Sequence, residues 1–349
     1  MSLDKISLDL YFSLGFIPSP LSIYKEVKKL EPGQNLIFNL NNKKIKKWAY
    51  FEIPRHNPEY NIEELVKEGN NLLKDSVEKR MISDVPVGAF LSGGLDSTSI
   101  VKYMTNFTKI KKLNTFSIGF EGKWDETPFV NKAVNSFNTI HHHDYFFESD
   151  YDEINSHVST IYDEPFADSS KIATHLICKE AFKGGIKVAL SGDGADEVMG
   201  GYMYFHKCPD SYEFDKECRR LLKDIHKYDV LRSDRTISSN GLEPRVPFLD
   251  RGFVQLYLSI PPQVRYHVAN KQMEKHLIRN AYANTGLLPN EVLWRRKEAF
   301  SDGVSKQSRS WYQVIEEKIP KSIIDIYYIN KDFYSVNTPK SPEQYYYRK

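Results

Sequence analysis

Short apolar stretches alternate with longer amphipathic segments between residues 61 and 190 of this chain. The apolar stretches predict strands at residues 85–91, 113–120, 143–147 and 186–190. Apolar residues at helical spacing predict helices at residues 61–77, 97–105, 127–137, 153–162 and 171–182. Strands separated by helices of about 10–15 residues predict an α/β fold, with a parallel sheet covered by helices on both faces.

The two ends of the chain follow other patterns. Residues 35–40 and 45–51 flank Asn41-Asn42, which predicts a β-hairpin. Helical patterns dominate from about residue 207, and no clear period is visible from Trp311 onward. We therefore expect an entry segment over residues 1–55, a main domain over residues 56–310 and a peripheral tail over residues 311–349.

Charge and cysteine content limit the functional classes. The chain has 349 residues, with 48 Lys and Arg against 46 Asp and Glu, a formal net charge of +2. This balance gives no bulk attraction to nucleic acid or to an anionic membrane, and no window approaches the ~20 apolar residues of a membrane span. Three cysteines cannot form a disulfide framework, which favours a reducing compartment such as the cytoplasm.

Two clusters of metal-binding residue types lack the spacing of a metal site. His141-His142-His143 does not have the i, i+4 spacing of helical zinc ligands. Cys208 and Cys218 are not part of a C-x-x-C pair. We expect no metal site at either place.

The stretch Ser92-Gly93-Gly94-Leu95-Asp96-Ser97 directly follows the first predicted buried strand. Glycines allow backbone N–H groups to approach an anion, and the N-terminus of the following helix attracts negative charge. Asp96 suits such a site if Mg²⁺ lies between it and a phosphate. The competing interpretation is an ordinary helix cap, a common use of Asp and Ser.

A second glycine-containing loop, residues 191–197, follows the predicted strand at 186–190. It carries Asp193, Asp196 and Glu197. A solvated acidic turn is one interpretation. Because ligands bind at the carboxyl ends of strands in parallel sheets, a bound cation or cationic substrate explains three carboxylates here better.

These stretches resemble known motifs. Residues 92–97 are similar to the SGGxDS pyrophosphate loop of the ATP pyrophosphatases, the PP-loop superfamily with an adenine nucleotide α-hydrolase-like fold. Four more stretches resemble the asparagine synthetase family, namely DEP at 163–165, LSGxGxDExxxGY at 190–202, NGLExRVPFLD at 240–250 and WRxKExFSDGV at 294–304. The match spans roughly residues 56–310 and implies that fold, followed by a mostly helical C-terminal part.

The resemblance implies ATP-dependent amidation of aspartate to asparagine through β-aspartyl-AMP, with release of AMP and pyrophosphate. The implied cofactors are ATP and Mg²⁺, and aspartate and ammonia are the implied substrates. ATP would be held by Leu91, Ser92, Gly93, Gly94, Asp96, Ser97, Ile118, Ser191 and Gly192. The metal would be held by Asp96 and Asp196, and Lys297 would stabilise charge at the α-phosphate.

Three further residues have roles that the resemblance implies less directly. Asp193 stands where many asparagine synthetases have Glu, a residue linked to adenylate formation and to the handling of ammonia. Its side chain is one methylene shorter, which puts its reach in doubt. Glu197 and Arg245 are candidates for binding the amino and carboxylate groups of aspartate.

Glutamine-dependent family members begin with a glutaminase domain whose nucleophile is an N-terminal cysteine. The first cysteine here is Cys178, and residues 1–55 resemble the junction between the two halves. We therefore expect either a fragment lacking its glutaminase domain or an enzyme that uses free ammonia; a homodimer is compatible with both.

Three other functions are alternatives. The first is a PP-loop synthetase that adenylates another acid (β-lactam, peptide or sugar pathways), and the second is a non-catalytic scaffold. The third is a tRNA-modifying pyrophosphatase, which the near-neutral net charge disfavours.

Overall fold

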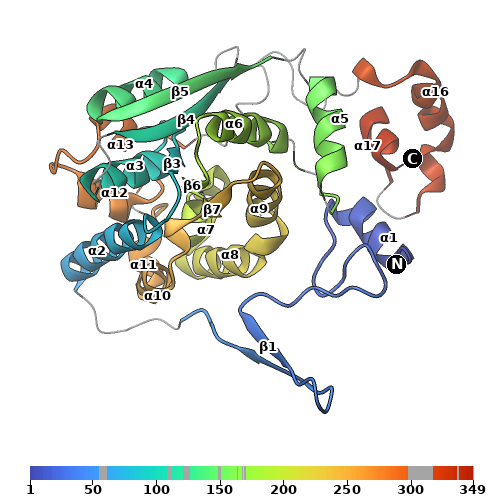
Figure 1. Ribbon diagram of the computed structural model, residues 1–349, viewed down its shortest axis with the longest axis horizontal. Helices are drawn as coiled ribbons and strands as arrows, with labels where there is room; N and C mark the ends of the chain where they lie inside the picture. The colour runs from blue at the N-terminus through green and yellow to red at the C-terminus, as the bar shows by residue number, and fades with distance from the viewer. Residues whose placement is uncertain are drawn as a thin grey trace.

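A five-stranded parallel sheet forms the centre of the protein, as a computed structural model shows (Figure 1). The structure describes residues 1–54, 61–107, 112–120, 126–147, 151–162, 164–166, 168, 170–269, 271–297, 317–335 and 338–348. The strand order is β5-β4-β3-β6-β7, and every neighbouring pair is parallel. The strands are β3 (Val87–Phe90), β4 (Leu113–Phe120), β5 (Thr139–Phe146), β6 (Val188–Leu190) and β7 (Glu243–Arg245). The predicted α/β fold class is confirmed.

Helices cover both faces of this sheet. Val87 and Ala89 of β3 belong to the larger apolar core, which they share with α2 (Ile62–Arg80) and α3 (Leu95–Phe107). Phe116 of β4 points to the opposite face, against α6 (Lys171–Lys183) and α9 (Asp229–Ser239). Side chains alternate between the faces of a strand, so one short apolar run supplies both layers.

The remaining helices complete the main domain. Asn61 caps α2 through its side chain, and Glu63 and Glu64 in the first turn and Lys79 and Arg80 in the last turn match the helix dipole. The other helices of the main domain are α4 (Thr127–Ser136), α5 (Tyr151–Ile161), α7 (Ala195–Met199), α8 (Ser211–Asp224), α10 (Arg251–Ser259), α11 (Pro262–Arg265), α12 (His276–Tyr282) and α13 (Asn290–Leu293). Short 3₁₀ turns occur at Met203–Lys207, Ile225–Lys227, Pro247–Leu249 and Lys331–Phe333. None of the helices in the described ranges is both long and apolar enough to cross a bilayer.

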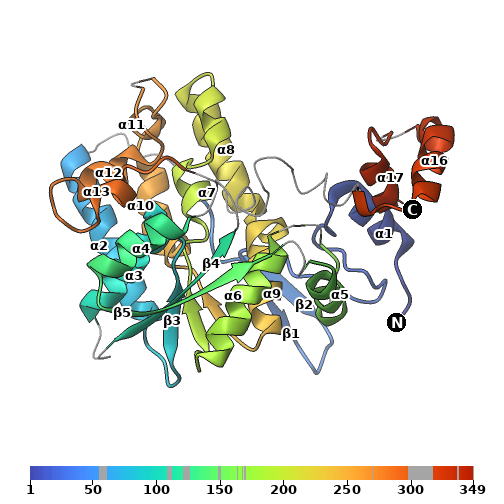
Figure 2. The same ribbon diagram turned by 90° about the horizontal axis from the view of Figure 1, so that it is seen from above.

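The segments near the two ends of the chain lie away from the central sheet (Figures 1 and 2). The predicted hairpin is present as β1 (Gln34–Phe38) paired with β2 (Ile45–Ala49), and it projects from the body (Figure 1). Figure 2 shows α1 (Lys5–Leu14), α16 (Lys321–Asn330) and α17 (Pro342–Arg348) gathered on the side of α5. Four elements differ from the sequence prediction, and one of them is β7, a strand in the stretch expected to be helical. The tail, expected without a period, contains α16 and α17, and β5 begins at Thr139 rather than at residue 143.

Candidate active site

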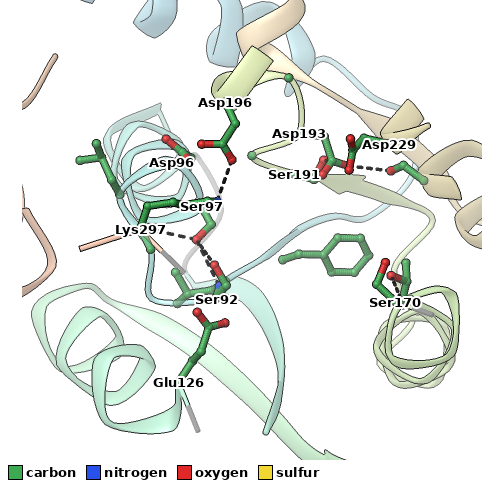
Figure 3. A pocket seen from close by; sticks show the side chains of 18 of the residues that line it. Ser92, Asp96, Ser97, Glu126, Ser170, Ser191, Asp193, Asp196, Asp229 and Lys297 are labelled. Carbon is green, nitrogen blue, oxygen red and sulfur yellow. Dashed lines mark hydrogen bonds and ion pairs between the residues drawn. The ribbon is translucent and has the colours of Figure 1, made fainter. Parts of the chain in front are cut away.

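One large pocket lies where β3, β4 and β6 end, the edge at which parallel α/β sheets bind ligands. The two predicted glycine loops, residues 92–97 and 191–197, form its floor from neighbouring strands. Figure 3 shows two groups of side chains in it: Asp96, Asp196 and Lys297 at one end, and Asp193, Asp229 and Ser170 at the other. We call these the phosphate end and the acid end.

The loop between β3 and α3 is held in shape by its own hydroxyl groups. The backbone N–H of Ser92 donates to Ser97 Oγ at 3.2 Å, and the two hydroxyl oxygens lie 3.0 Å apart. Gly93 has φ +68°, and a Cβ on it would lie 2.5 Å from the backbone nitrogen of Val130 in α4. Only glycine therefore fits between this loop and α4. The pocket is lined by Ser92, Gly94, Asp96 and Ser97, whereas Gly93 supports the turn from behind.

Two lysines bind the two aspartates of the phosphate end. The Nζ atom of Lys275 lies 2.6 Å from Asp96 Oδ2 and 2.6 Å from Asp196 Oδ1. Lys297 Nζ lies 2.7 Å from the other oxygen of Asp196. Burial favours the neutral acid, but the attraction of both ammonium groups outweighs it and holds the pKa of Asp196 well below its usual range. Conversely, although burial opposes its charge, Asp196 and Asp96 raise the pKa of Lys297 above its ordinary value.

A buried ion pair fixes the backbone beside Lys297. Glu274 Oε1 accepts from Arg279 Nη2 at 2.5 Å and from the backbone N–H of Lys297 at 3.1 Å. Both members of the pair are about 2% exposed. This contact ties the segment that carries Lys297 to α12. The rest of that motif, residues 298–304, lies outside the described residues.

The acid end is built around one buried arginine, Arg232 of α9. Its guanidinium lies within 3.2–3.8 Å of the carboxylates of Asp229, Asp193 and Asp168. Burial opposes its charge, but these three carboxylates raise the pKa of Arg232. Arg232 Nη1 also donates to Ser170 Oγ at 3.1 Å, whereas Nε has no hydrogen-bond partner among the described residues.

Two acidic residues of the second loop face this end. Asp193 Oδ2 accepts hydrogen bonds from Ser191 Oγ at 3.0 Å and from Ser233 Oγ at 2.7 Å. Glu197 is 3% exposed and accepts a 2.6 Å hydrogen bond from the Tyr202 hydroxyl. Burial, together with the charges of Asp229 and Asp196, raises the pKa of Glu197 to about 8. A carboxyl group with this pKa can gain or lose a proton near neutral pH.

The structure brings most of the predicted site residues together in the pocket, but Gly93 and Arg245 do not line it. Leu91 and Ile118, at the ends of β3 and β4, line the pocket between the two loops, as do Ser191 and Gly192. Arg245 does not line it. Its guanidinium donates to the carbonyl oxygens of Arg80 and Ile82 and to the carboxylate of Glu243, so β7 directs it away from the acid end.

Sequence reasoning missed Lys275 and Arg232, which complete the two ends. Lys275 is 2% exposed and adopts a left-handed conformation, φ 61°, before α12. A Cβ on Gly201 would collide with Lys275 Cε and Asp196 Oδ1, so only glycine at this position leaves room for the lysine side chain. Arg232 precedes the NGLExRVPFLD stretch by eight residues and lies outside all five motif stretches of the sequence. Neither residue had a sequence signal apart from its charge.

The histidine run of β5 has hydrogen-bond partners in the sheet. His141 contacts Thr115 and Ser117 at 3.0 and 2.9 Å, and His143 Nδ1 lies 2.6 Å from Ser117 Oγ. His142 stacks on Phe116. These contacts support β4, whose Ser117 and Ile118 line the pocket.

Of the DEP stretch at residues 163–165, Glu164 is buried and forms an ion pair with Lys29. Asp163 lies outside the described residues.

The donor set at the phosphate end fits Mg²⁺. Asp96 and Asp196 aim one oxygen each at a single point, now taken by Lys275 Nζ. The second oxygen of Asp96 is buried and has no hydrogen-bond partner among the described residues. Mg²⁺ is typically held by one or two carboxylates together with water and substrate phosphates, so these two residues are sufficient as its protein ligands.

Comparisons with known proteins show what the whole chain is similar to. The family model described as asparagine synthase matches residues 68–214 and 207–335. A putative asparagine synthetase (glutamine-hydrolyzing) 2 of Methanocaldococcus jannaschii is 54% identical over 202 residues, 58% of this chain and 39% of the relative. The asparagine synthetase of Cricetulus griseus is 38% identical over 297 residues, 82% of this chain and 52% of the relative. The chain thus spans about half the length of such relatives or less.

A solved NMN synthetase from Francisella tularensis is similar at 12% identity, covering 83% of this chain and 94% of the other. Its TM-score is 0.36. This similarity is too low to bear on function.

Proposed function

The chain belongs to the asparagine synthase family, and on that premise we propose that it converts aspartate, ATP and ammonia to asparagine, AMP and pyrophosphate. The proposed route has two steps. The β-carboxylate of aspartate attacks the α-phosphorus of ATP and gives β-aspartyl-AMP, with pyrophosphate as the leaving group. Ammonia then attacks the acyl carbon, AMP leaves, and one proton is lost from the nitrogen.

This proposal rests on the difference in charge between the two ends of the pocket. At the phosphate end each carboxylate of the described residues is paired with a cation: Asp96 and Asp196 with lysines, Glu274 with Arg279, and Glu126 with Arg295 at 2.8 Å. Arg296 adds a further positive charge to the lining. At the acid end Arg232 faces Asp168, Asp193 and Asp229, with Glu197 beside them. One end thus suits a polyphosphate and the other a positively charged amino group.

Charge neutralisation is the main requirement of the first step, because a carboxylate must approach a phosphate. Lys297, whose pKa is raised, stays protonated and can stabilise the negative charge that develops at the α-phosphate. The loop of Ser92 and Ser97 would hold the pyrophosphate part through N–H groups and hydroxyls. Mg²⁺ held by Asp96 and Asp196 would supply further positive charge at the phosphate oxygens.

The acid end has groups for an amino acid substrate. Arg232, whose Nε forms no hydrogen bond among the described residues and lies 3.8 Å from Asp168, is our candidate for binding a substrate carboxylate. Asp193 and Glu197 can accept from the substrate amino group or from ammonia. We assign Asp193 as a catalytic residue for the ammonia step. Leu91 and Ile118 would flank the adenosine, and the backbone of Ser191 and Gly192 would contact it.

We further propose that residues 56–310 act as the synthetase domain, with residues 1–55 and 311–349 peripheral to the chemistry. Free ammonium is the nitrogen donor in the test below, so no glutaminase domain is required for it.

Pyrophosphate release tests the proposal. Purified protein with ATP, Mg²⁺ and ammonium is assayed over a panel of acids that includes aspartate, glutamate and β-amino acids. We expect aspartate to give the dominant rate and to yield AMP and asparagine in equal amounts. If another acid gives the dominant rate, that acid and not aspartate is the substrate. Failure to bind ATP would contradict the synthetase assignment as a whole.

A further inference from the structure

The cluster formed by Lys275, Asp96 and Asp196 has a consequence for how the metal enters the pocket. We propose that Lys275 is a built-in counter-cation which occupies the metal position in the nucleotide-free protein, so that a divalent cation binds only together with the nucleotide. The proposal rests on the proposed function only for the use of a metal–ATP complex.

The geometry places the ammonium group where the metal is expected. Lys275 Nζ lies at the same distance, 2.6 Å, from one oxygen of each aspartate. Two carboxylate oxygens that converge on one point form the typical protein part of a Mg²⁺ site. The ammonium group and the metal cannot share this point, because two cations would then be in direct contact.

The position of Lys275 is fixed by the surrounding fold. The residue is 2% exposed and adopts a left-handed φ of 61° at the start of α12, a conformation that costs free energy for a side chain with a Cβ. Gly201, beside α7, leaves the space that the lysine stem fills. A flexible surface lysine would leave the carboxylates exposed to any cation, whereas packing holds the stem of Lys275 beside them and leaves only its ammonium group to move.

Charge balance decides which ligand can enter. Lys275 and Lys297 neutralise the two aspartates, so a bare divalent cation meets no net negative charge from them. Among the described residues no group of three or more His, Cys, Asp or Glu side chains could hold a metal on its own. A triphosphate changes this balance: its oxygens add metal ligands and offer both ammonium groups an alternative anionic partner.

Titration with Mn²⁺, followed by the electron paramagnetic resonance signal of the free ion, tests the proposal on the full chain without nucleotide. We expect the wild type to bind no Mn²⁺ in the micromolar range. Lys275→Met keeps the length of the side chain and removes its charge, and we expect it to bind one Mn²⁺ at least roughly tenfold more tightly than the wild type. Lys79→Met, which removes an exposed lysine paired with Asp75, is the matched control and should behave as the wild type.

Two results would overturn the proposal: tight Mn²⁺ binding by the nucleotide-free wild type, or no gain of affinity in Lys275→Met. If Lys275→Met is unfolded in metal-free buffer, recovery of its cooperative melting transition by Mn²⁺ supports the proposal. Failure of Mn²⁺ to restore the fold of both Lys275→Met and Lys275→Gln contradicts it.

A second titration, with the wild type and a non-hydrolysable ATP analogue, separates this proposal from the proposed function. We expect one Mn²⁺ to bind when the analogue is present. Absence of Mn²⁺ binding with the analogue would contradict the ATP-using function itself. A gain of affinity in nucleotide-free Lys275→Met would still support the role of Lys275 in that case.

Discussion

The two ends of the pocket use the same residue types in opposite proportions. At the phosphate end, buried carboxylates are matched by lysine and arginine, and the pKa of Asp196 is lowered. At the acid end, several carboxylates share Arg232, and the pKa of Glu197 is raised to about 8. Asp196 and Glu197 are adjacent in the sequence, so the opposite shifts of their pKa values come from the neighbours that the fold gives them.

This contrast predicts a division of labour. At the phosphate end the described carboxylates are matched by cations and Arg296 adds a further positive charge, so we expect this end to bind an anionic ligand that brings its own metal. At the acid end carboxylates outnumber cations, so we expect it to bind an ammonium group. Four substitutions test whether the ends are as independent as the contacts suggest.

Arg232→Met should have the largest effect, and on stability. Removing the guanidinium leaves three carboxylates of the acid end without their shared cation, which we expect to lower the free energy of unfolding by about 3–5 kcal/mol. Denaturant unfolding measures this loss. Arg220→Met, which breaks an exposed pair with Glu217, is the control and should cost less than about 1 kcal/mol.

The same Arg232→Met variant also tests whether the two ends are independent. Where it is still folded, it should bind an ATP analogue as the wild type does. Loss of nucleotide binding in the folded variant would show that the ends are coupled.

Lys297→Met probes the phosphate end through the rate. We expect aspartate-dependent pyrophosphate release to fall by about 10²–10³-fold, because the variant lacks a charge that stabilises the transition state. A pyrophosphate assay under saturating substrates measures the change in kcat. Lys132→Met removes an exposed lysine paired with Glu291 and should leave the rate unchanged. A rate within twofold of wild type for Lys297→Met would remove this residue from the mechanism.

Glu197→Gln tests the raised pKa at the acid end. Between about pH 4.5 and 8 the unfolded chain loses the Glu197 proton while the native protein retains it, so the stability of the wild type falls as pH rises through this window. The slope from this one group is at most about 1.4 kcal/mol per pH unit. Glutamine does not titrate, so the variant should show a flatter dependence of its denaturation midpoint on pH. Parallel pH profiles for the two proteins would mean that Glu197 is already ionised at neutral pH.

Arg245→Ala should have the smallest effect, and it separates the pocket from its surroundings. The guanidinium donates hydrogen bonds to the carbonyl oxygens of Arg80 and Ile82, so we expect the free energy of unfolding to fall by about 1–2 kcal/mol. The KM for aspartate should not change, because Arg245 does not line the pocket. A large rise in this KM with unchanged stability would support the substrate-binding role that the family resemblance implies.

The sequence predicted the features that depend on neighbouring residues. The alternation of apolar strands and amphipathic helices predicted the parallel sheet, and the Ser92–Ser97 and Ser191–Glu197 loops lie at strand ends as expected. A glycine turn between a buried strand and a helix is a local structure, so its residues and their order are visible in one stretch of sequence. Arg245, predicted to bind substrate, does not line the pocket, because the direction of a side chain on β7 depends on how that strand pairs with β6.

The sequence by itself therefore determined the α/β architecture and the two loops that hold the floor of the pocket. Only the tertiary structure decided which charges face those loops. Lys275 is 179 residues from Asp96, and Arg232 is 62 residues from Ser170, yet each pair is in hydrogen-bond contact. Helices α9 and α12 pack against the domain through their apolar faces. This packing places Arg232 and Lys275 at opposite ends of the same pocket, and no local sequence pattern encodes it.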